Sequence, residues 1–165
     1  MANVRHQVHN KLAITALKEV GESEVSGIDF NHRIIEYFRA VEFSPTARGD
    51  ETPWCSAFVN FILQKNKIKG TRLALARSFM SWYNSISPTG HEGPPSATQI
   101  KDAPVGAVIV LKRGKDPMYG HVGFFINLIG DQVFVLGGNQ NNSVCIKPYK
   151  LSDVLDVRVI KGSVT

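Results

Sequence analysis

The chain changes its pattern of apolar residues near its midpoint, and this change limits the folds that it can adopt. Before residue 85 apolar side chains recur at helical spacing, whereas after residue 104 they form short runs separated by turn residues. The runs follow one another closely, and connections this short join antiparallel strands. Helices first and strands second indicate an α+β fold, with N-terminal helices packed on an antiparallel β-sheet.

Four helices are expected in the first half of the chain. They are predicted over residues 12–20, 31–41, 54–67 and 73–83. Asn31 is a suitable N-cap for the second helix, and Gly21 and Gly70 are stop signals for the first and third. The polar, Gly- and Pro-containing stretches 45–53 and 85–104 are expected to be loops.

Five strands are expected in the second half. They are predicted over residues 105–112, 120–129, 132–138, 143–149 and 156–162. Gly130 and Asp131 indicate a turn between the second and third of them. Each half looks too small to bury a core by itself, so we expect one domain over residues 1–165.

Composition and charge narrow the classes of partner. Hydrophobic content of 43% and charged content of 20% are typical of globular proteins, and no apolar run approaches the roughly 20 residues of a membrane span. The net charge of +5 favours an anionic partner. The basic residues are scattered, however, so we do not expect nucleic acid. A solvated basic surface, a cell wall and a membrane surface without stable insertion remain as readings of the charge.

The sequence indicates neither a disulfide nor a metal site. The start, MANVRHQVHNKLAI, lacks the features of a signal peptide, so we expect synthesis in the cytoplasm, where disulfides are rare. Two cysteines cannot form a four-ligand zinc site unaided, and the His6–His9 pair near the terminus is read as incidental. We therefore expect no metal and no cofactor.

Cys55 occupies a position where a cysteine can be reactive. In the segment DETPWCSAF, Pro53 and Trp54 place it at the start of the third helix, where free N–H groups favour an anion. Such a site lowers the pKa of a thiol, and the N–H groups of Cys55 and Ser56 could hold an oxyanion. The alternative reading is a small buried hydrophobe, which suits Cys145 better because that residue lies in mid-strand.

A cysteine nucleophile needs a base, and His121 is the histidine best placed for that role. It opens a strong strand between Gly120 and Gly123, which allow a substrate or another backbone to approach closely. Alternation puts His121, Gly123 and Phe125 on one face of the strand. The other reading is a strand histidine that is satisfied by a neighbour.

The base in turn needs a polar partner, and the stretch VLGGNQNN on the next strand offers two. A two-residue turn at Gly130 and Asp131 would put His121 opposite Gln140, whereas a three-residue turn would put it opposite Asn139. Either amide oxygen could accept from the imidazole N–H and set its tautomer. The stretch also resembles a simple polar turn.

The segments TPWCSAFVNFIL, GHVGFFI and VLGGNQNN, in this order, resemble the CHAP and NlpC-like superfamily of papain-like cysteine peptidases. The likeness is closest to a branch found in phage endolysins and in effectors secreted against rival bacteria, and it extends over about residues 8–160. The segments ALKEVGESEVSGIDFNHRIIEYF and GTRLALARSFMSW contribute to it.

The resemblance implies a papain-like fold and specific roles for the motif residues. Cys55 would be the nucleophile, His121 the base and Asn139 the orienting residue, with Gln140 as second choice for orientation. Trp54 would line the cleft beside the thiol. The sequence departs from many relatives in having Ala107 where they have the aspartate of a PGD turn, in having no glutamine between residues 49 and 54, and in lacking an acidic calcium cluster.

The function expected from this resemblance is peptidoglycan hydrolysis, by an N-acetylmuramoyl-L-alanine amidase or by a stem-peptide or cross-link endopeptidase. The enzyme would act as a phage endolysin, as a monomer, on the cell wall or in the periplasm after release by a holin or a secretion system. One alternative is a secreted antibacterial amidase effector, which would add an immunity protein as a partner. Others are a thiol protease or deamidase acting on proteins, and a non-catalytic binding module.

Overall fold

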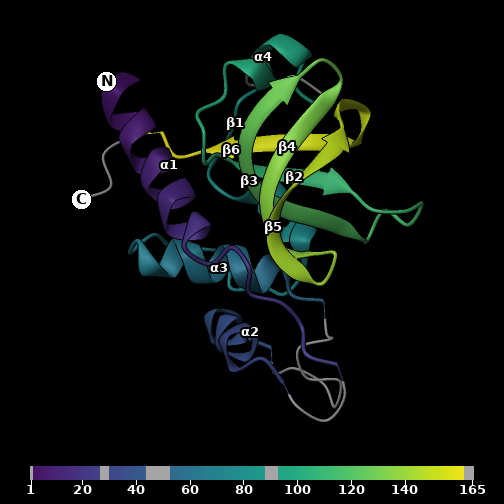
Figure 1. The fold of residues 1–165 in the computed structure, drawn as a ribbon. Coiled ribbons are helices and arrows are strands. Elements are labelled where there is room, and N and C mark those ends of the chain that lie inside the picture. Colours follow the sequence, from purple (N-terminus) through teal and green to yellow (C-terminus); the bar gives the residue numbers. More distant parts are fainter. Residues whose placement is uncertain (1, 27–29, 44–52, 88–92, 162–165) are drawn as a thin grey trace.

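The computed structural model describes residues 2–26, 30–43, 53–87 and 93–161, and it confirms the α+β architecture (Figure 1). Helices cover a six-stranded sheet whose strand order is β1-β6-β2-β3-β4-β5, and the neighbouring strands pair antiparallel. The strands are β1 (Asn84–Ser85), β2 (Val108–Lys112), β3 (Gly120–Ile129), β4 (Gln132–Gln140), β5 (Ser143–Lys150) and β6 (Val154–Val159).

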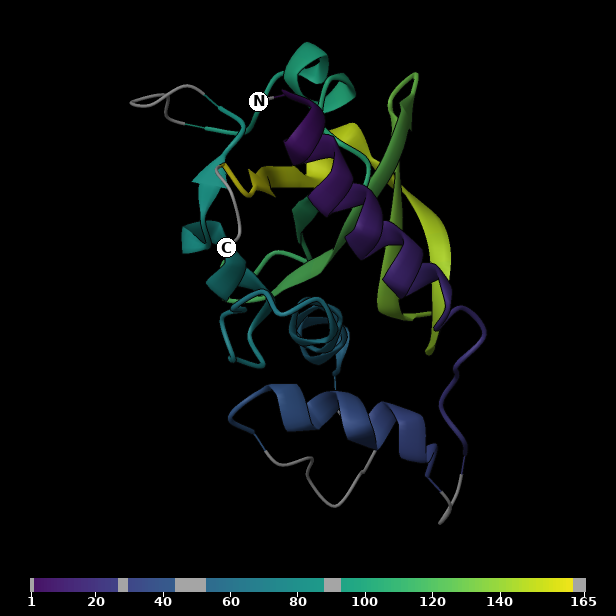
Figure 2. The ribbon, with the colours of Figure 1, turned by 90° about the vertical axis from the view of Figure 1, so that its left-hand side faces the viewer.

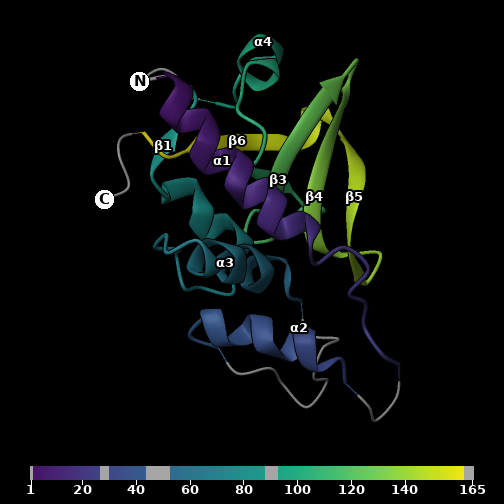
Figure 3. The ribbon, with the colours of Figure 1, turned by 60° about the vertical axis from the view of Figure 1, so that its left-hand side comes forward.

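Helix α3 is central to the helical layer. Figures 2 and 3 show it between the sheet and α2, while α1 runs across the same side of the sheet. The α-helices are α1 (Ala2–Leu17), α2 (His32–Tyr37), α3 (Cys55–Lys65) and α4 (Ala97–Lys101), and the 3-10 helices are η1 (Phe38–Ala40), η3 (Ala76–Ser81) and η4 (Leu151–Asp153). Among the residues described, no helix has the length and apolar character needed to span a bilayer.

Several elements differ from the expectation. The first helix begins ten residues before the expected start at Leu12, and residues 73–83 contain only the short η3. The expected loop 85–104 contains part of β1 and all of α4, whose N-cap Ser96 forms a reciprocal capping box with Gln99. The loop predicted at 45–53 falls outside the described residues except for Pro53. As predicted, Asn31 caps α2 by accepting from the N–H of Arg33.

The sheet buries apolar side chains on both faces. Val122 and Phe124 of β3 join the core beneath the helices, whereas Phe125 joins a second core on the opposite face. The predicted alternation along this strand is therefore confirmed. Ile100 of α4 belongs to the second core, so the helix that was missed covers the face that the N-terminal helices leave open.

A strap between α1 and α2 ties the sheet to the start of α3. The Gly21 N–H donates to the Val144 carbonyl, and the Val144 N–H donates to the Glu22 carbonyl, so the strap runs beside the start of β5. Farther along, the Glu24 carboxylate accepts a hydrogen bond of 2.9 Å from the indole Nε1–H of Trp54. The residue that caps α3 is thus held by a segment far away in the sequence.

Close packing of α3 on β4 depends on Gly138. A Cβ added there would lie 2.7 Å from the Cβ of Phe58 and would also overlap the ring of Trp54. We predict that Gly138→Ala lowers the free energy of unfolding by about 1–3 kcal/mol, because well-packed cores resist added atoms. Urea denaturation measures this loss. Gly130→Ala is the control, since it places no new atom within 4 Å and adds only the strain of a residue at φ +61°. An equal loss in both variants would contradict the packing argument.

Candidate active site

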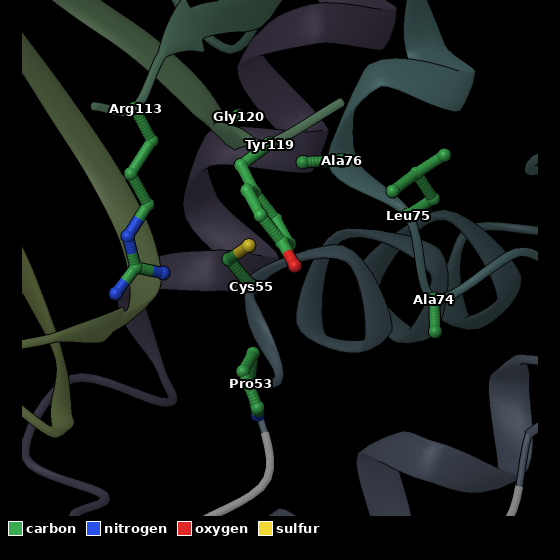
Figure 4. A pocket seen from close by; sticks show the side chains of 8 residues that line it. All are labelled: Pro53, Cys55, Ala74, Leu75, Ala76, Arg113, Tyr119 and Gly120. Carbon is green, nitrogen blue, oxygen red and sulfur yellow. The ribbon is translucent and has the colours of Figure 1, made fainter. Parts of the chain in front are cut away.

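Cys55 is the first residue of α3, and its sulfur faces a cleft of about 400 Å³ (Figure 4). The N-cap residue, Trp54, makes no side-chain hydrogen bond to the first turn of the helix. Trp54 therefore provides no side-chain cap for the first N–H groups of α3, and these groups can donate hydrogen bonds to an anion. The side chain itself is only 5% exposed, so the thiol lies at the bottom of the cleft.

The cleft lies between two segments that are distant in sequence. Ala74, Leu75 and Ala76 form one wall, and the base of the β2–β3 hairpin forms the other with Arg113, Tyr119 and Gly120. Most of this lining is apolar. The two walls are fastened together, since Arg77 Nε donates to the Tyr119 carbonyl at 2.7 Å.

The side chain of Ser56 has a structural role and is not exposed in the cleft. Its side chain is fully buried, and its hydroxyl donates to the Leu73 carbonyl at 2.6 Å. This bond holds the chain where it enters the wall of the cleft. The expectation that Ser56 contacts a substrate therefore applies only to its backbone N–H.

Trp54 does not line the cleft, in contrast to the expectation. Its side chain has 0% exposure and packs against Tyr37, with ring centroids 5.8 Å apart. The hydrogen bond to Glu24 and the close approach of Gly138 fix the indole on the interior side of α3. The large apolar ring is more stable in the core than in the open cleft.

His121 forms a hydrogen bond with Gln140, whose amide orientation defines the roles of both partners. Gln140 Nε2 donates to the carbonyls of Val135 and Cys145, at 3.1 and 2.6 Å. Its Oε1 must therefore face His121 Nε2, which lies 2.9 Å away. Because an amide oxygen can only accept, Nε2 carries the proton and Nδ1 is left as the basic nitrogen.

The orienting contact thus involves Gln140, and not Asn139 as first expected. The turn between β3 and β4 has two residues, but the register shifts near Ile126, so simple counting would again favour Asn139. A second irregularity lies between Gly137 and Gln140, where Asn139 adopts φ 55°. This left-handed residue interrupts the alternation of β4 and turns the next side chain, that of Gln140, toward His121.

Tyr149 completes the surroundings of His121, and the sequence analysis did not identify it. Its hydroxyl donates to Gln140 Oε1 at 3.1 Å, and its ring stacks on the imidazole with centroids 5.3 Å apart. Tyr149 ends the predicted strand 143–149, to which the sequence assigns no functional residue. No local pattern distinguishes it, because the contact depends on how β5 lies beside β4.

Burial determines the protonation of the candidate pair. It raises the pKa of the Cys55 thiol, although hydrogen bonds from backbone N–H groups, including that of Val122, and the charge of Arg113 act in the opposite direction. Burial also lowers the pKa of His121 to about 4, against the effect of its bond to Gln140. The expectation of a thiol with a lowered pKa is thus wrong for this conformation, because desolvation exceeds the effect of the helix terminus.

We predict that the resting thiol and imidazole are both neutral between about pH 5 and pH 8. A lowered imidazole pKa keeps His121 unprotonated above about pH 4, and a raised thiol pKa keeps Cys55 protonated through neutral pH. The rate of Cys55 alkylation by iodoacetamide should therefore rise steeply only above neutral pH. A plateau of fast alkylation from pH 5 to pH 8 would instead reveal a thiolate–imidazolium pair.

Within the described ranges, no cluster of three or more His, Cys, Asp or Glu residues has a geometry that could hold a metal ion. Cys55 and Cys145 are both free thiols. The arrangement is therefore that of a thiol at a helix N-terminus, a histidine on the adjoining strand and an amide that orients it.

Comparison with protein families assigns the chain to a family. A model of the CHAP domain matches residues 47–139, which is more than half of the chain. The chain belongs to the CHAP domain family. CHAP domains are generally cysteine-dependent amidases or peptidases, and they act on peptidoglycan. The matched segment contains Cys55 and His121 and stops at Asn139, so Gln140 lies just beyond it.

One solved structure resembles this CHAP domain over most of its length. It is a protein described as similar to a lipoprotein of the NLP/P60 family, from Staphylococcus aureus subsp. aureus Mu50. The match has 20% sequence identity and a TM-score of 0.46, and it covers 94% of this chain and 42% of the other. A search of curated proteins gave no significant match.

Proposed function

We propose that this CHAP domain hydrolyses an amide bond of peptidoglycan with Cys55 as the nucleophile, His121 as the base and Gln140 as the orienting residue. The observation that carries the proposal is the fixed tautomer of His121. Its Nε2–H is held by an amide whose own donors are engaged, so only Nδ1 can accept a proton. Cys55 faces the cleft at the start of α3, beside the strand that carries this histidine.

The proposed reaction proceeds in two halves. Nδ1 of His121 takes the thiol proton while the sulfur of Cys55 attacks the amide carbonyl, and the N–H groups of the first turn of α3 stabilise the oxyanion. The protonated imidazole then gives its proton to the leaving amine, and a thioester remains on Cys55. Water attacks this thioester as it gives a proton to Nδ1, and the imidazolium returns that proton to the sulfur when the C–S bond breaks, which releases the carboxylic acid and re-forms the thiol.

The neutral resting pair fits this general-base sequence. A thiol and a neutral imidazole can exchange a proton when the carbonyl is attacked, so no ion pair is needed beforehand. A substrate that fills the cleft would displace water and strengthen the interactions of the helix N–H groups with the oxyanion.

Mass spectrometry of digested peptidoglycan tests the proposal. The purified protein is incubated with cell walls of Gram-positive and Gram-negative origin, with Cys55→Ala in parallel. We expect new muropeptides from the wild type only, with masses that distinguish cleavage of the muramoyl–alanine amide from cleavage inside the stem or cross-link. If the folded wild type releases no fragment from any wall, peptidoglycan is not the substrate, and proteins become the next substrates to assay.

We further propose that the enzyme acts as a lytic endolysin whose basic surface, with a net charge of +5 over the chain, holds it to the anionic envelope. Wall binding should then weaken as salt is raised, because salt screens exposed charges. Expression in bacteria with and without a holin measures the lytic role. Lysis that needs the holin is expected, whereas killing only of neighbouring cells would favour a secreted effector.

A further inference from the structure

Among the described residues that line the cleft, Arg113 is a cation that the fold itself does not use. Arg113, at the base of the β2–β3 hairpin, lines the cleft together with Cys55. Neighbouring basic residues have partners, since Lys112 pairs with Asp153 at 3.2 Å and Arg77 donates to the Tyr119 carbonyl. Over the part of the chain that the structure describes, the Arg113 guanidinium has neither an ion pair nor a hydrogen bond, so its donors are available to a ligand.

The position of Arg113 relative to the thiol is informative. Figure 4 shows the side chains of Arg113 and Tyr119 extending from the hairpin toward the level of Cys55. The charge of Arg113 acts on the thiol and on the imidazole of His121, so it lies within electrostatic range of both. Arg113 therefore lines the same cleft as the thiol that would attack the scissile amide.

The other described residues that line the cleft carry no formal charge. The opposite wall consists of Ala74, Leu75 and Ala76, and Pro53 lies below the thiol. A ligand that enters the cleft displaces water from apolar surface, and a charge interaction becomes stronger as water leaves. A guanidinium in such surroundings favours a carboxylate, which can accept two parallel hydrogen bonds from it.

We propose that Arg113 selects substrates that carry a free carboxylate next to the scissile amide. This inference rests on the proposed function and deepens it, because peptidoglycan stem peptides carry such carboxylates and some organisms convert them to carboxamides. Arg113 is thereby a specificity-determining residue. The enzyme discriminates between stem peptides with a free acid and the same peptides with an amide at that place.

The test uses two forms of one stem-peptide substrate, with the carboxylate nearest the cleaved bond either free or amidated. The readout is the ratio of kcat/KM for the two forms, which is insensitive to any general effect of Arg113 on the thiol. We expect the wild type to favour the free acid by about tenfold. Arg113→Gln should bring the ratio close to one, and Arg113→Lys should restore part of the preference.

Lys115→Gln provides a matched control, since it removes one exposed cation from the same hairpin outside the cleft. Its ratio should equal that of the wild type. A wild-type ratio near one, or an unchanged ratio in Arg113→Gln, overturns the inference while leaving the proposed function intact. So does an equal change in Lys115→Gln, because the effect would then come from net charge alone.

A binding experiment separates this inference from the proposed function. Isothermal titration of the two peptide forms into Cys55→Ala should show about tenfold tighter binding of the free acid, and the double variant with Arg113→Gln should lose this difference. If the wild type cleaves no wall fragment but this difference is found, hydrolysis fails and carboxylate recognition stands. If the two forms bind Cys55→Ala equally, carboxylate recognition fails, whatever the outcome for hydrolysis.

Discussion

Replacing Cys55 with alanine should abolish peptidoglycan hydrolysis, with a loss on the order of 10⁴-fold in kcat, because loss of the nucleophile removes the covalent route. The fold should survive. The cysteine side chain is small, and within the structure described it makes no side-chain bond that joins α3 to the sheet except the contact with the Val122 amide. Release of soluble muropeptides measures the activity, and urea denaturation measures the stability.

The second free thiol supplies the control for this experiment. Cys145→Ala removes a sulfur that lies 3.4 Å from the Gln140 carbonyl oxygen but leaves the backbone carbonyl that positions the Gln140 amide. It should retain most of the activity. Comparable losses in Cys145→Ala and Cys55→Ala would contradict the assignment of the nucleophile, and so would a Cys55→Ala protein that still releases fragments.

The second large effect concerns Gln140, for which Gln140→Leu should lower kcat/KM by about 100-fold. Leucine keeps the approximate volume but offers no oxygen to the Nε2–H of His121, so the imidazole loses the contact that sets its tautomer and orientation. The carbonyls of Val135 and Cys145 also lose their donor, which should reduce the free energy of unfolding by about 1–3 kcal/mol. Kinetics are therefore measured well below the melting temperature of the variant.

Asn139→Gly decides between the two neighbouring amides. Glycine adopts the φ of 55° at this position without strain, so the variant deletes the side chain while it preserves the irregularity of β4. We expect near wild-type activity. An Asn139→Gly variant as inactive as Gln140→Leu would contradict this assignment.

The activity of Tyr149→Phe should lie between those of Asn139→Gly and Gln140→Leu, with a loss of a few-fold in kcat/KM. The ring that stacks on His121 remains, and only the hydroxyl bond to Gln140 is removed.

Elements with a strong local pattern could be predicted from the sequence. The apolar residues of α3 and the alternation of β3 specify their elements with little outside help, and Asn31 caps α2 through a bond to a residue two positions away. Weaker elements could not be predicted. Strand β1 has two residues and exists through its pairing with β6, and η3 replaces the longer helix that local propensity favoured.

Near neighbours along the chain are enough to place a cysteine at the start of a helix and a histidine at the start of a strand beside glycines, so both placements could be predicted. The other features of the site depend on tertiary contacts. The left-handed backbone of Asn139 turns the side chain of Gln140 toward His121, so Gln140 makes the contact. The bond to Glu24 holds Trp54 in the core. The depth of burial sets the pKa of both reactive groups, and the approach of the β2–β3 hairpin brings Arg113 to the thiol. The register of the strands, the burial of the reactive groups and the position of the hairpin all depend on contacts between distant segments of the chain. The spacing of apolar residues in one sequence does not encode such contacts.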